Sequence, residues 1–209
     1  MSDSLTAPDQ TVLGLFQMLA LAFFLLTFGT AEAAVPSDTS EQGPWGNWGA
    51  AAYCPANQYV WGFRVKGEPY QGNGDDSALN AIQLICKDTN TGAKTYIRSL
   101  EGKWGTWGKD HICRETPVIG FAIQVERFQG KDKEKGSKDD TAAGNIKMTC
   151  GSETLIGDPP AAWGDWTRFY SCLDEGGYKK VRGFRTKVEP DQGNGDDTAL
   201  NAMQVYCDY

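Results

Sequence analysis

The sequence predicts an all-β protein made of three similar units, because one motif recurs three times at a constant spacing. Each copy opens with Trp-Gly-x-Trp, and the first tryptophans lie 59 residues apart. A cysteine follows nine residues later, and a second cysteine stands ten residues after an Asp-Asp pair. A constant period of this kind indicates repeated units that bury a shared core. The repeated positions are Trp45, Trp104 and Trp163, then Cys54, Cys113 and Cys172, and finally Cys86, Cys150 and Cys207.

Two strands are predicted in each copy. The first alternates apolar and polar residues, as in 62–66, 121–125 and 184–188, which favours a strand with one face buried. The second ends at the second cysteine and covers 81–86, 145–150 and 202–207. Gly-rich turns join the two strands in the first and third copies. No part of the chain after the apolar N-terminus keeps a helical period for long, so we expect short strands and many turns.

The second copy is longer than the others between its two strands. The stretch from Glu126 to Asp139 holds six residues more than the matching stretch from Glu68 to Asp75. The extra residues lie within 131–138, which mixes Lys, Asp and Glu without an apolar anchor. We expect a solvated loop tip, since a longer loop costs little closure entropy. The alternative is a basic loop that binds an anionic glycan.

The N-terminus has the pattern of an export signal. Residues 12–31 are almost wholly apolar, and Ala31-Glu32-Ala33 places small residues where a signal peptidase cleaves. We therefore expect a signal peptide over 1–33, followed by a flexible tail over 34–43. The alternative is a retained membrane anchor, because the first eleven residues lack Lys and Arg and the apolar run is nearly long enough to span a bilayer.

Charge and cysteine content narrow the function classes. The chain carries a net charge of −7 and shows no basic stripe, so nucleic acid is not an expected partner. All six cysteines follow the export signal, which predicts three disulfides. Six cysteines allow many pairings, and the repeat makes one bridge within each copy the simplest set: Cys54–Cys86, Cys113–Cys150 and Cys172–Cys207. Zinc is disfavoured, since no Cys-x-x-Cys pair exists and His111 is the only histidine. We expect neither a metal nor another cofactor.

These motifs resemble the vitelline membrane outer layer protein I family. The third copy carries the pattern most fully, over 187–201, and the first copy repeats it over 66–80. The second copy keeps Asp139-Asp140-Thr141-Ala142 but lacks the following Leu-Asn. The resemblance implies one domain over 44–209, a β-prism of the first type. Three four-stranded Greek-key sheets would pack around a pseudo-threefold axis, one per copy, with copies of about 45–103, 104–162 and 163–209.

The tryptophans allow a structural and a functional interpretation. An aromatic residue that recurs once per unit is typical of a core, so we expect Trp45, Trp104 and Trp163 inside the prism. Polar residues flank the second tryptophans, which makes them the candidates for stacking on sugar rings. These are Trp48, Trp107 and Trp166. Trp61 occurs in one copy only, and we expect it at the surface.

The acidic residues of the Gly-rich loops are more typical of turn stabilisation than of catalysis. Glycoside hydrolysis needs two carboxylates about 5–10 Å apart, and neighbouring residues on a strand point to opposite faces. The weak catalytic candidates are Asp75, Asp196, Glu68 and Glu189. Asp in a Gly-rich turn more simply accepts backbone N–H groups, as Asn80 and Asn201 would. A lone His111 lacks a placed partner, so we expect it at the surface.

We therefore predict a secreted, extracellular coat or secretion protein that binds glycan or coat partners without catalysis, through loops at one end of the prism. The alternative is a transferase-like or glycosidase-like enzyme acting on N-acetylglucosamine oligomers, an activity that the resemblance also suggests. A third possibility is a purely structural coat component. After signal cleavage we expect no membrane partner.

Overall fold

The chain divides into two units, residues 1–32 and 33–209. The computed structural model describes residues 35–36, 45–69, 77–126, 131–132, 136–137, 143–160, 162–191, 193 and 198–208. The predicted signal peptide therefore lies outside the described residues, as does most of the predicted tail. Among the residues that are described, no helix is long and apolar enough to cross a membrane.

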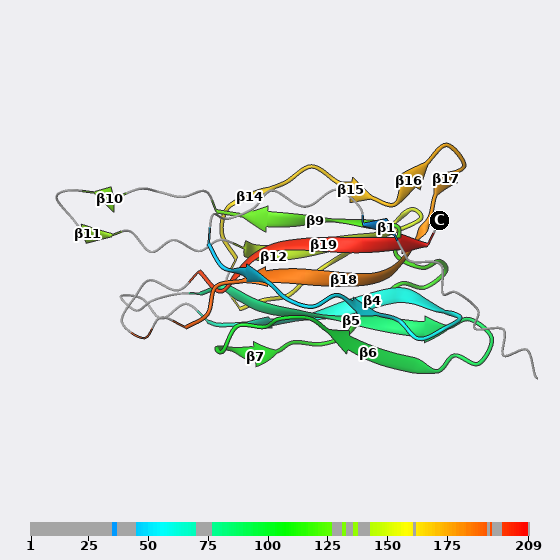
Figure 1. The fold of residues 1–209 in the computed structure, drawn as a ribbon, viewed down its shortest axis with the longest axis horizontal. Coiled ribbons are helices and arrows are strands. Elements are labelled where there is room, and N and C mark those ends of the chain that lie inside the picture. Colours follow the sequence, from blue (N-terminus) through cyan, green and yellow to red (C-terminus); the bar gives the residue numbers. More distant parts are fainter. Residues whose placement is uncertain are drawn as a thin grey trace, which may run out of the picture. The chain divides into compact units, whose positions relative to one another are not determined.

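Three antiparallel sheets make up the second unit, and the described residues contain strands but no helix (Figure 1). The first sheet runs in the order β6 (Lys94–Arg98), β5 (Leu79–Asp88), β4 (Gln58–Gly67) and β7 (Thr106–Trp107), with β8 (His111–Ile112) also on β4. The second runs β13 (Glu153–Ile156), β12 (Ala143–Cys150), β9 (Gly120–Val125) and β14 (Asp165–Trp166), with β15 (Tyr170–Ser171) on β9. The third runs β1 (Val35–Pro36), β19 (Leu200–Asp208), β18 (Lys180–Val188) and β2 (Asn47–Trp48), with β3 (Ala52–Tyr53) on β18.

Two small hairpins lie outside these sheets. Strands β10 (Lys131–Asp132) and β11 (Gly136–Ser137) pair within the insertion of the second copy. Strands β16 (Leu173–Asp174) and β17 (Gly177–Tyr178) pair near the third copy's first cysteine. Within the segment predicted as a tail, β1 pairs with Cys207 and Tyr206 of β19.

Each sheet takes the strands at one of its two edges from another copy, so the expectation of one sheet per copy is wrong. Trp107 of the second copy pairs with Lys66 of the first, and Trp48 of the first copy pairs with Lys187 of the third. The glycine of each Trp-Gly-x-Trp motif makes this pairing possible. Gly164 has a φ of +87°, and a Cβ there would lie 2.2 Å from the backbone of Val125 in the preceding copy. Only glycine allows both that conformation and that approach.

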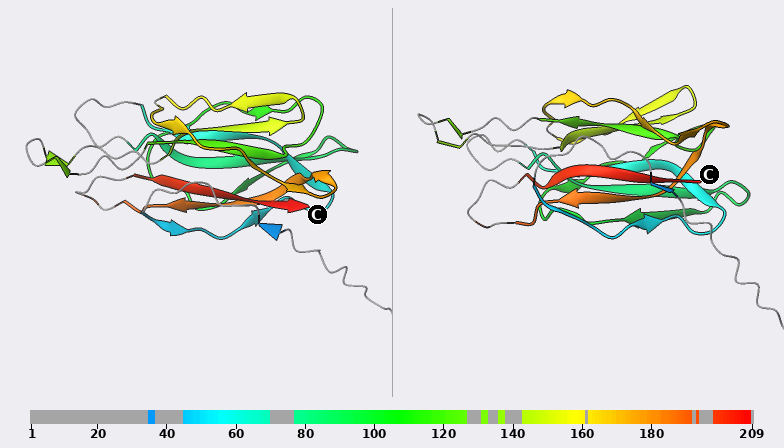
Figure 2. Two further views of the ribbon diagram at one scale, coloured as in Figure 1. Left: turned by 90° about the horizontal axis from the view of Figure 1, so that it is seen from above. Right: turned by 45° about the horizontal axis from the view of Figure 1, so that its top comes forward.

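The long strands lie roughly along one axis and alternate in direction, so the connections gather at two ends (Figures 1 and 2). We call the end where β4, β9 and β18 finish the loop end. The opposite end, where β5, β12 and β19 finish, is the disulfide end. This arrangement is the β-prism that the resemblance implies.

Phenylalanines, not tryptophans, fill the centre of the core. Phe63, Phe121 and Phe184 follow the same glycine in the three copies, and each is fully buried. By contrast, Trp45 and Trp104 are 41% exposed and Trp163 is only partly buried, so the expectation that the first tryptophans form the core is wrong. The alternating strands explain the difference, because each Phe lies on an inward position of a long central strand. The first tryptophans instead precede short edge strands.

Trp61 is also placed differently from the expectation. Its side chain is 6% exposed, and the Lys87 ammonium group lies 4.3 Å from the centre of its ring. Its indole N–H is buried without a hydrogen-bond partner in the described part of the chain. Occurrence in a single copy therefore did not indicate a surface residue.

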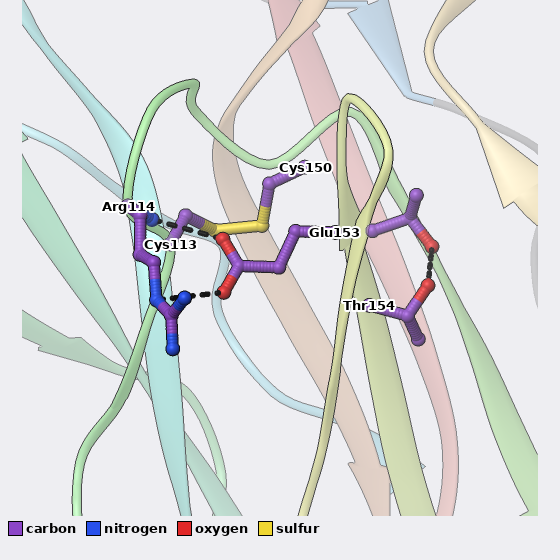
Figure 3. Close-up of a disulfide and its surroundings, with 6 residues drawn as sticks. Cys113, Arg114, Cys150, Glu153 and Thr154 are labelled. Carbon is purple, nitrogen blue, oxygen red and sulfur yellow. Dashed lines mark hydrogen bonds and ion pairs between the residues drawn. A yellow bond between two sulfur atoms is a disulfide. The ribbon is translucent and has the colours of Figure 1, made fainter.

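The three disulfides join the two cysteines of each copy: Cys54–Cys86, Cys113–Cys150 and Cys172–Cys207. The pairing that the repeat makes simplest is the one the structure has. Figure 3 shows the Cys113–Cys150 bridge beside Arg114 and Glu153. Each bridge closes a loop of 32 to 37 residues. In the chain-entropy model such a bridge stabilises the fold by about 3–4 kcal/mol.

Candidate functional site

Glu68 fixes the two sides of the Gly-rich loop of the first copy. The Ser77 hydroxyl donates to the Glu68 carboxylate at 2.7 Å, and the Asn80 amide donates to the same hydroxyl at 2.7 Å. The Glu68 N–H also donates to the carbonyl of Ala78 at 2.9 Å. Asn80 in turn accepts a backbone N–H from Trp104 at 3.1 Å, which confirms its predicted role toward the backbone. The carboxylate thus acts as a structural acceptor at the base of the loop.

The third copy repeats this network with Glu189. The Thr198 hydroxyl donates to its carboxylate at 2.6 Å, and the Thr198 N–H donates at 3.2 Å. The Asn201 amide donates to the Thr198 hydroxyl at 2.7 Å. The intervening alanines, Ala78 and Ala199, have φ values of +45° and +47°. An alanine in this region costs about 1–2 kcal/mol, so the network holds a locally unfavourable backbone in both copies.

Asp75 and Asp196, the other two weak catalytic candidates, lie outside the described residues. The structure places Glu68 and Glu189 in separate copies, each with its own hydroxyl and amide partners.

A cation lies over each of the second tryptophans. The Arg185 guanidinium is 4.7 Å from the ring centre of Trp48, and the Arg64 guanidinium is 5.1 Å from that of Trp107. In the remaining sheet the Lys147 ammonium is 4.5 Å from the ring centre of Trp166. Such contacts stabilise a ring position by roughly 0.5–1 kcal/mol at exposed sites. We call Trp48, Trp107 and Trp166 the cation-covered tryptophans.

The cation comes from different strands in different copies. Arg64 and Arg185 follow the core phenylalanine, and each bonds a glutamine across the strand pair, Gln83 at 2.6 Å and Gln204 at 2.8 Å. In the second copy Ala122 takes the arginine position, and its cross-strand partner is Lys147 instead of glutamine. In the second copy the cation over the indole therefore comes from the paired strand, as Lys147, and not from the position after the phenylalanine.

The three tryptophans differ in their exposure. Trp48 and Trp107 are half-buried, whereas Trp166 is 37% exposed and is the most open of the three. The cation lies over one face of each indole, and the exposed part of Trp166 is the part that a ligand can reach. Sequence reasoning did not identify the cations, although the replacement of Arg by Ala in one copy together with Gln by Lys was a readable signal.

The first tryptophans lie toward the loop end. The Lys103 ammonium is 4.3 Å from the ring centre of Trp104 and also forms an ion pair with Asp191 of the third copy. Lys66 donates to the carbonyls of Gly102 and Lys103 at 3.0 and 3.1 Å. The ion pair with Asp191 joins the first and third copies at the loop end, whereas the Lys66 hydrogen bonds lie within the first copy.

His111 is largely buried, so the surface position expected for it is wrong. Its ring stacks on Phe63 with centres 5.3 Å apart, in the position that Tyr170 takes on Phe121 in the next sheet. Its Nε2 lies 2.8 Å from the Asp158 carboxylate, and Lys109 lies 3.4 Å from the same group. Burial alone would raise the pKa of Asp158, but the hydrogen bonds and charges of His111 and Lys109 outweigh it and lower that pKa. This histidine is a structural replacement for an aromatic residue.

The described residues offer no metal centre. No group of three or more His, Cys, Asp or Glu side chains among them is placed to hold an ion.

Solved structures of plant lectins share this fold. Frutalin from Artocarpus incisa matches with a TM-score of 0.51 and 9% identity, covering 87% of this chain and 99% of frutalin. A mannose-binding lectin from champedak matches with a TM-score of 0.50 and 11% identity, covering 86% and 99% of the two chains. The structure of an artocarpin–mannotriose complex matches with a TM-score of 0.50 and 10% identity, covering 85% and 99%. At these identities the likeness shows a shared fold.

Sequence relatives are more specific. Vitelline membrane outer layer protein 1 homologs of Mus musculus and Homo sapiens are each 34% identical to this chain over 173 residues, which is 81% of this chain and 81% of each relative. The family model described as vitelline membrane outer layer protein I matches residues 36–208, which include all three copies and all three disulfides. The chain belongs to the vitelline membrane outer layer protein I family.

Proposed function

We propose that this protein binds oligosaccharides without converting them, and that it does so outside the cell as part of a coat or secretion. The observation that carries the proposal is the set of cation-covered tryptophans, one on each sheet. An indole face accepts the C–H groups of a pyranose ring, and the fixed cation holds the indole in position and can donate to sugar hydroxyls. Trp166 is the most accessible of the three, so we assign it the largest share of binding.

The fold supports this class of ligand. The champedak protein is named a mannose-binding lectin, and artocarpin was crystallised with mannotriose. Because a shared fold does not fix a shared site, the ligand of this chain needs its own measurement. Oligomers of N-acetylglucosamine and of mannose are the two probes of choice.

The bonding of the glutamates argues for binding over catalysis. A general acid or nucleophile needs a carboxylate directed at substrate, and Glu68 and Glu189 instead accept hydrogen bonds from the hydroxyls that close their own loops. The same arrangement in two copies is what a structural role predicts, since a single active site does not need equivalent copies.

The cysteines support an extracellular location. Three buried disulfides and no free cysteine among the described residues are typical of an oxidising compartment. Cleavage after Ala33 would release a chain that starts just before β1. N-terminal sequencing of the protein from the medium of expressing cells should read Ala-Val-Pro. A secreted form that retains residues 1–33 would contradict this part of the proposal.

Binding is tested by calorimetric titration of the oxidised protein with N-acetylglucosamine trimer and with mannotriose. Trp166→Ala should weaken binding about tenfold, which corresponds to roughly 1.4 kcal/mol. Tyr178→Ala is the matched control, because it removes an aromatic ring that is 57% exposed on a hairpin away from the cation-covered tryptophans. Equal affinity of both variants and the wild type would reject the indole as the site. The absence of binding heat with both saccharides would reject the proposed binding of these two sugars.

A further inference from the structure

A pocket of about 450 Å³ lies at the disulfide end, far along the second sheet from Trp166. Trp166 pairs with Gln124 near the end of β9, whereas the pocket forms where β12 ends at Cys150 and turns into β13. Its lining comes from the segment after Cys113 and from that turn: Arg114, Glu115, Thr116, Cys150, Gly151, Ser152 and Glu153. We call it the Ser152 pocket.

Two elements give the Ser152 pocket a fixed shape. The Cys113–Cys150 disulfide joins its two lining segments directly. The Arg114 backbone N–H also donates to the Glu153 carboxylate at 3.0 Å, and the Arg114 side chain approaches the other oxygen of that carboxylate at 3.8 Å (Figure 3). Glu153 therefore positions the wall mainly through the hydrogen bond from the Arg114 backbone, because the arginine side chain is largely exposed.

Other polar groups of the pocket remain available for a ligand. Glu115, Thr116 and Ser152 are exposed, and in the described part of the chain the Glu115 carboxylate and the two hydroxyls have no hydrogen-bond or ion-pair partner within the protein. Arg114 uses its Nε toward Glu153, which leaves its terminal nitrogens as donors. The pocket thus offers one charged acceptor, two groups that both donate and accept, and one charged donor.

The chemistry of these groups selects a class of ligand. An apolar ligand would meet mainly charged and hydroxyl side chains, and an anion would meet the unpaired Glu115 carboxylate. A metal ion would find no cluster of ligating side chains among the described residues. Neighbouring hydroxyls of a sugar both donate and accept, which matches a carboxylate, a guanidinium and two hydroxyls. The volume lies within the range of about 300–1,000 Å³ that small-molecule sites occupy.

We propose that the Ser152 pocket binds a neutral saccharide unit, as a second site separate from the cation-covered tryptophans. This inference rests on the proposed saccharide-binding function and adds to it a location and a mode of recognition through hydrogen bonds. Two sites at different places on one molecule would let the protein connect two glycan chains.

The test uses the oxidised protein without its signal segment, labelled with ¹⁵N and titrated with N-acetylglucosamine trimer and with mannotriose. The amide signals of Gly151, Ser152 and Arg114 should shift with one of the two saccharides, in addition to any shift near Trp166. Glu115→Gln should weaken the binding reported by these amides about tenfold, because a charged acceptor becomes a neutral one. Glu175→Gln, in the β16–β17 turn, is the matched control and should leave the affinity unchanged.

A bulky side chain in the pocket provides a second variant that does not depend on the charge of Glu115. Ser152→Trp should fill the pocket and abolish the local shifts, whereas Glu175→Trp should not, and the melting temperature of each variant reports whether it is folded. Shifts confined to the surroundings of Trp166 would overturn this inference and leave the proposed function intact. The absence of any shift with both saccharides would overturn both proposals. Local shifts that persist in folded Ser152→Trp would also overturn the assignment to this pocket.

Discussion

Substitution of Gly164 by alanine should destabilise the protein far more than its exposed position suggests. Two separate costs apply. The positive φ of Gly164, +87°, costs an alanine about 1–2 kcal/mol. The added Cβ would also lie 2.2 Å from the backbone carbon and oxygen of Val125, so one copy would have to move away from the preceding one. Forcing a methyl group into such a contact adds roughly 1–3 kcal/mol, which gives a total of about 2–5 kcal/mol.

Gly92 offers the matched control. Its φ is +75°, and a Cβ placed there has no neighbouring atom within 4 Å. Gly92→Ala should therefore lose only the backbone cost of about 1–2 kcal/mol. The difference between the two variants isolates the close approach of neighbouring copies.

The assay is guanidinium unfolding of both variants with the disulfides intact, followed by tryptophan fluorescence and circular dichroism. The midpoint should fall further for Gly164→Ala than for Gly92→Ala, at a similar dependence on denaturant. Equal losses would refute the reasoning, because the contact between the Trp-Gly-x-Trp segment and the preceding copy would then contribute nothing measurable.

Three further predictions follow from the core, the histidine and the tryptophans, and one concerns catalysis. Phe184→Ala should lower the free energy of unfolding by about 3–5 kcal/mol, measured in denaturant, and a loss below 1 kcal/mol would place the ring outside the core. Because the folded-state pKa of Asp158 is lowered, its stabilising contribution is present above the usual aspartate pKa of about 3.9 and is lost as pH falls through the folded value. Melting curves of wild type and Asp158→Asn should thus converge below about pH 4, and a gap that stays constant down to pH 2 would contradict the pairing with His111. Lys147→Ala should alter the fluorescence of Trp166 and cost roughly 0.5–1 kcal/mol, whereas an unchanged spectrum would argue against the contact. Mass spectrometry of N-acetylglucosamine oligomers incubated with oxidised protein should show an unchanged length distribution against a reduced, unfolded control, and new lengths formed only by folded protein would establish the enzyme alternative.

Local sequence determined the unit of this fold. The spacing of Trp-Gly-x-Trp, the cysteines and the Asp-Asp pairs was sufficient to predict three strand-rich copies with a disulfide inside each. These features depend on residues close together in the chain, or on a period that similar units share. The alternation around Phe63, Phe121 and Phe184 was also visible, and it correctly indicated strands with one buried face.

Tertiary structure decided how the copies are joined. The period is the same whether an edge strand pairs within its own copy or with the preceding one, so the pairing of Trp107 with Lys66 could not be read from spacing. The same limit explains the tryptophans. Side-chain size favours burial but does not specify which aromatic residue faces the axis, and here the inward strand positions belong to phenylalanine.

The candidate sites depend on contacts between distant residues, and this is why sequence reasoning identified them only in part. It selected Trp48, Trp107 and Trp166, but the cations that cover them come from neighbouring strands and, in one copy, from the opposite strand of the pair. The Ser152 pocket had no motif at all, because it exists only where a disulfide brings two turns together. Sequence alone determined the repeated unit and its covalent bridges, whereas the three-dimensional packing of those units decided which surfaces a ligand can reach, since that depends on long-range contacts that no local pattern encodes.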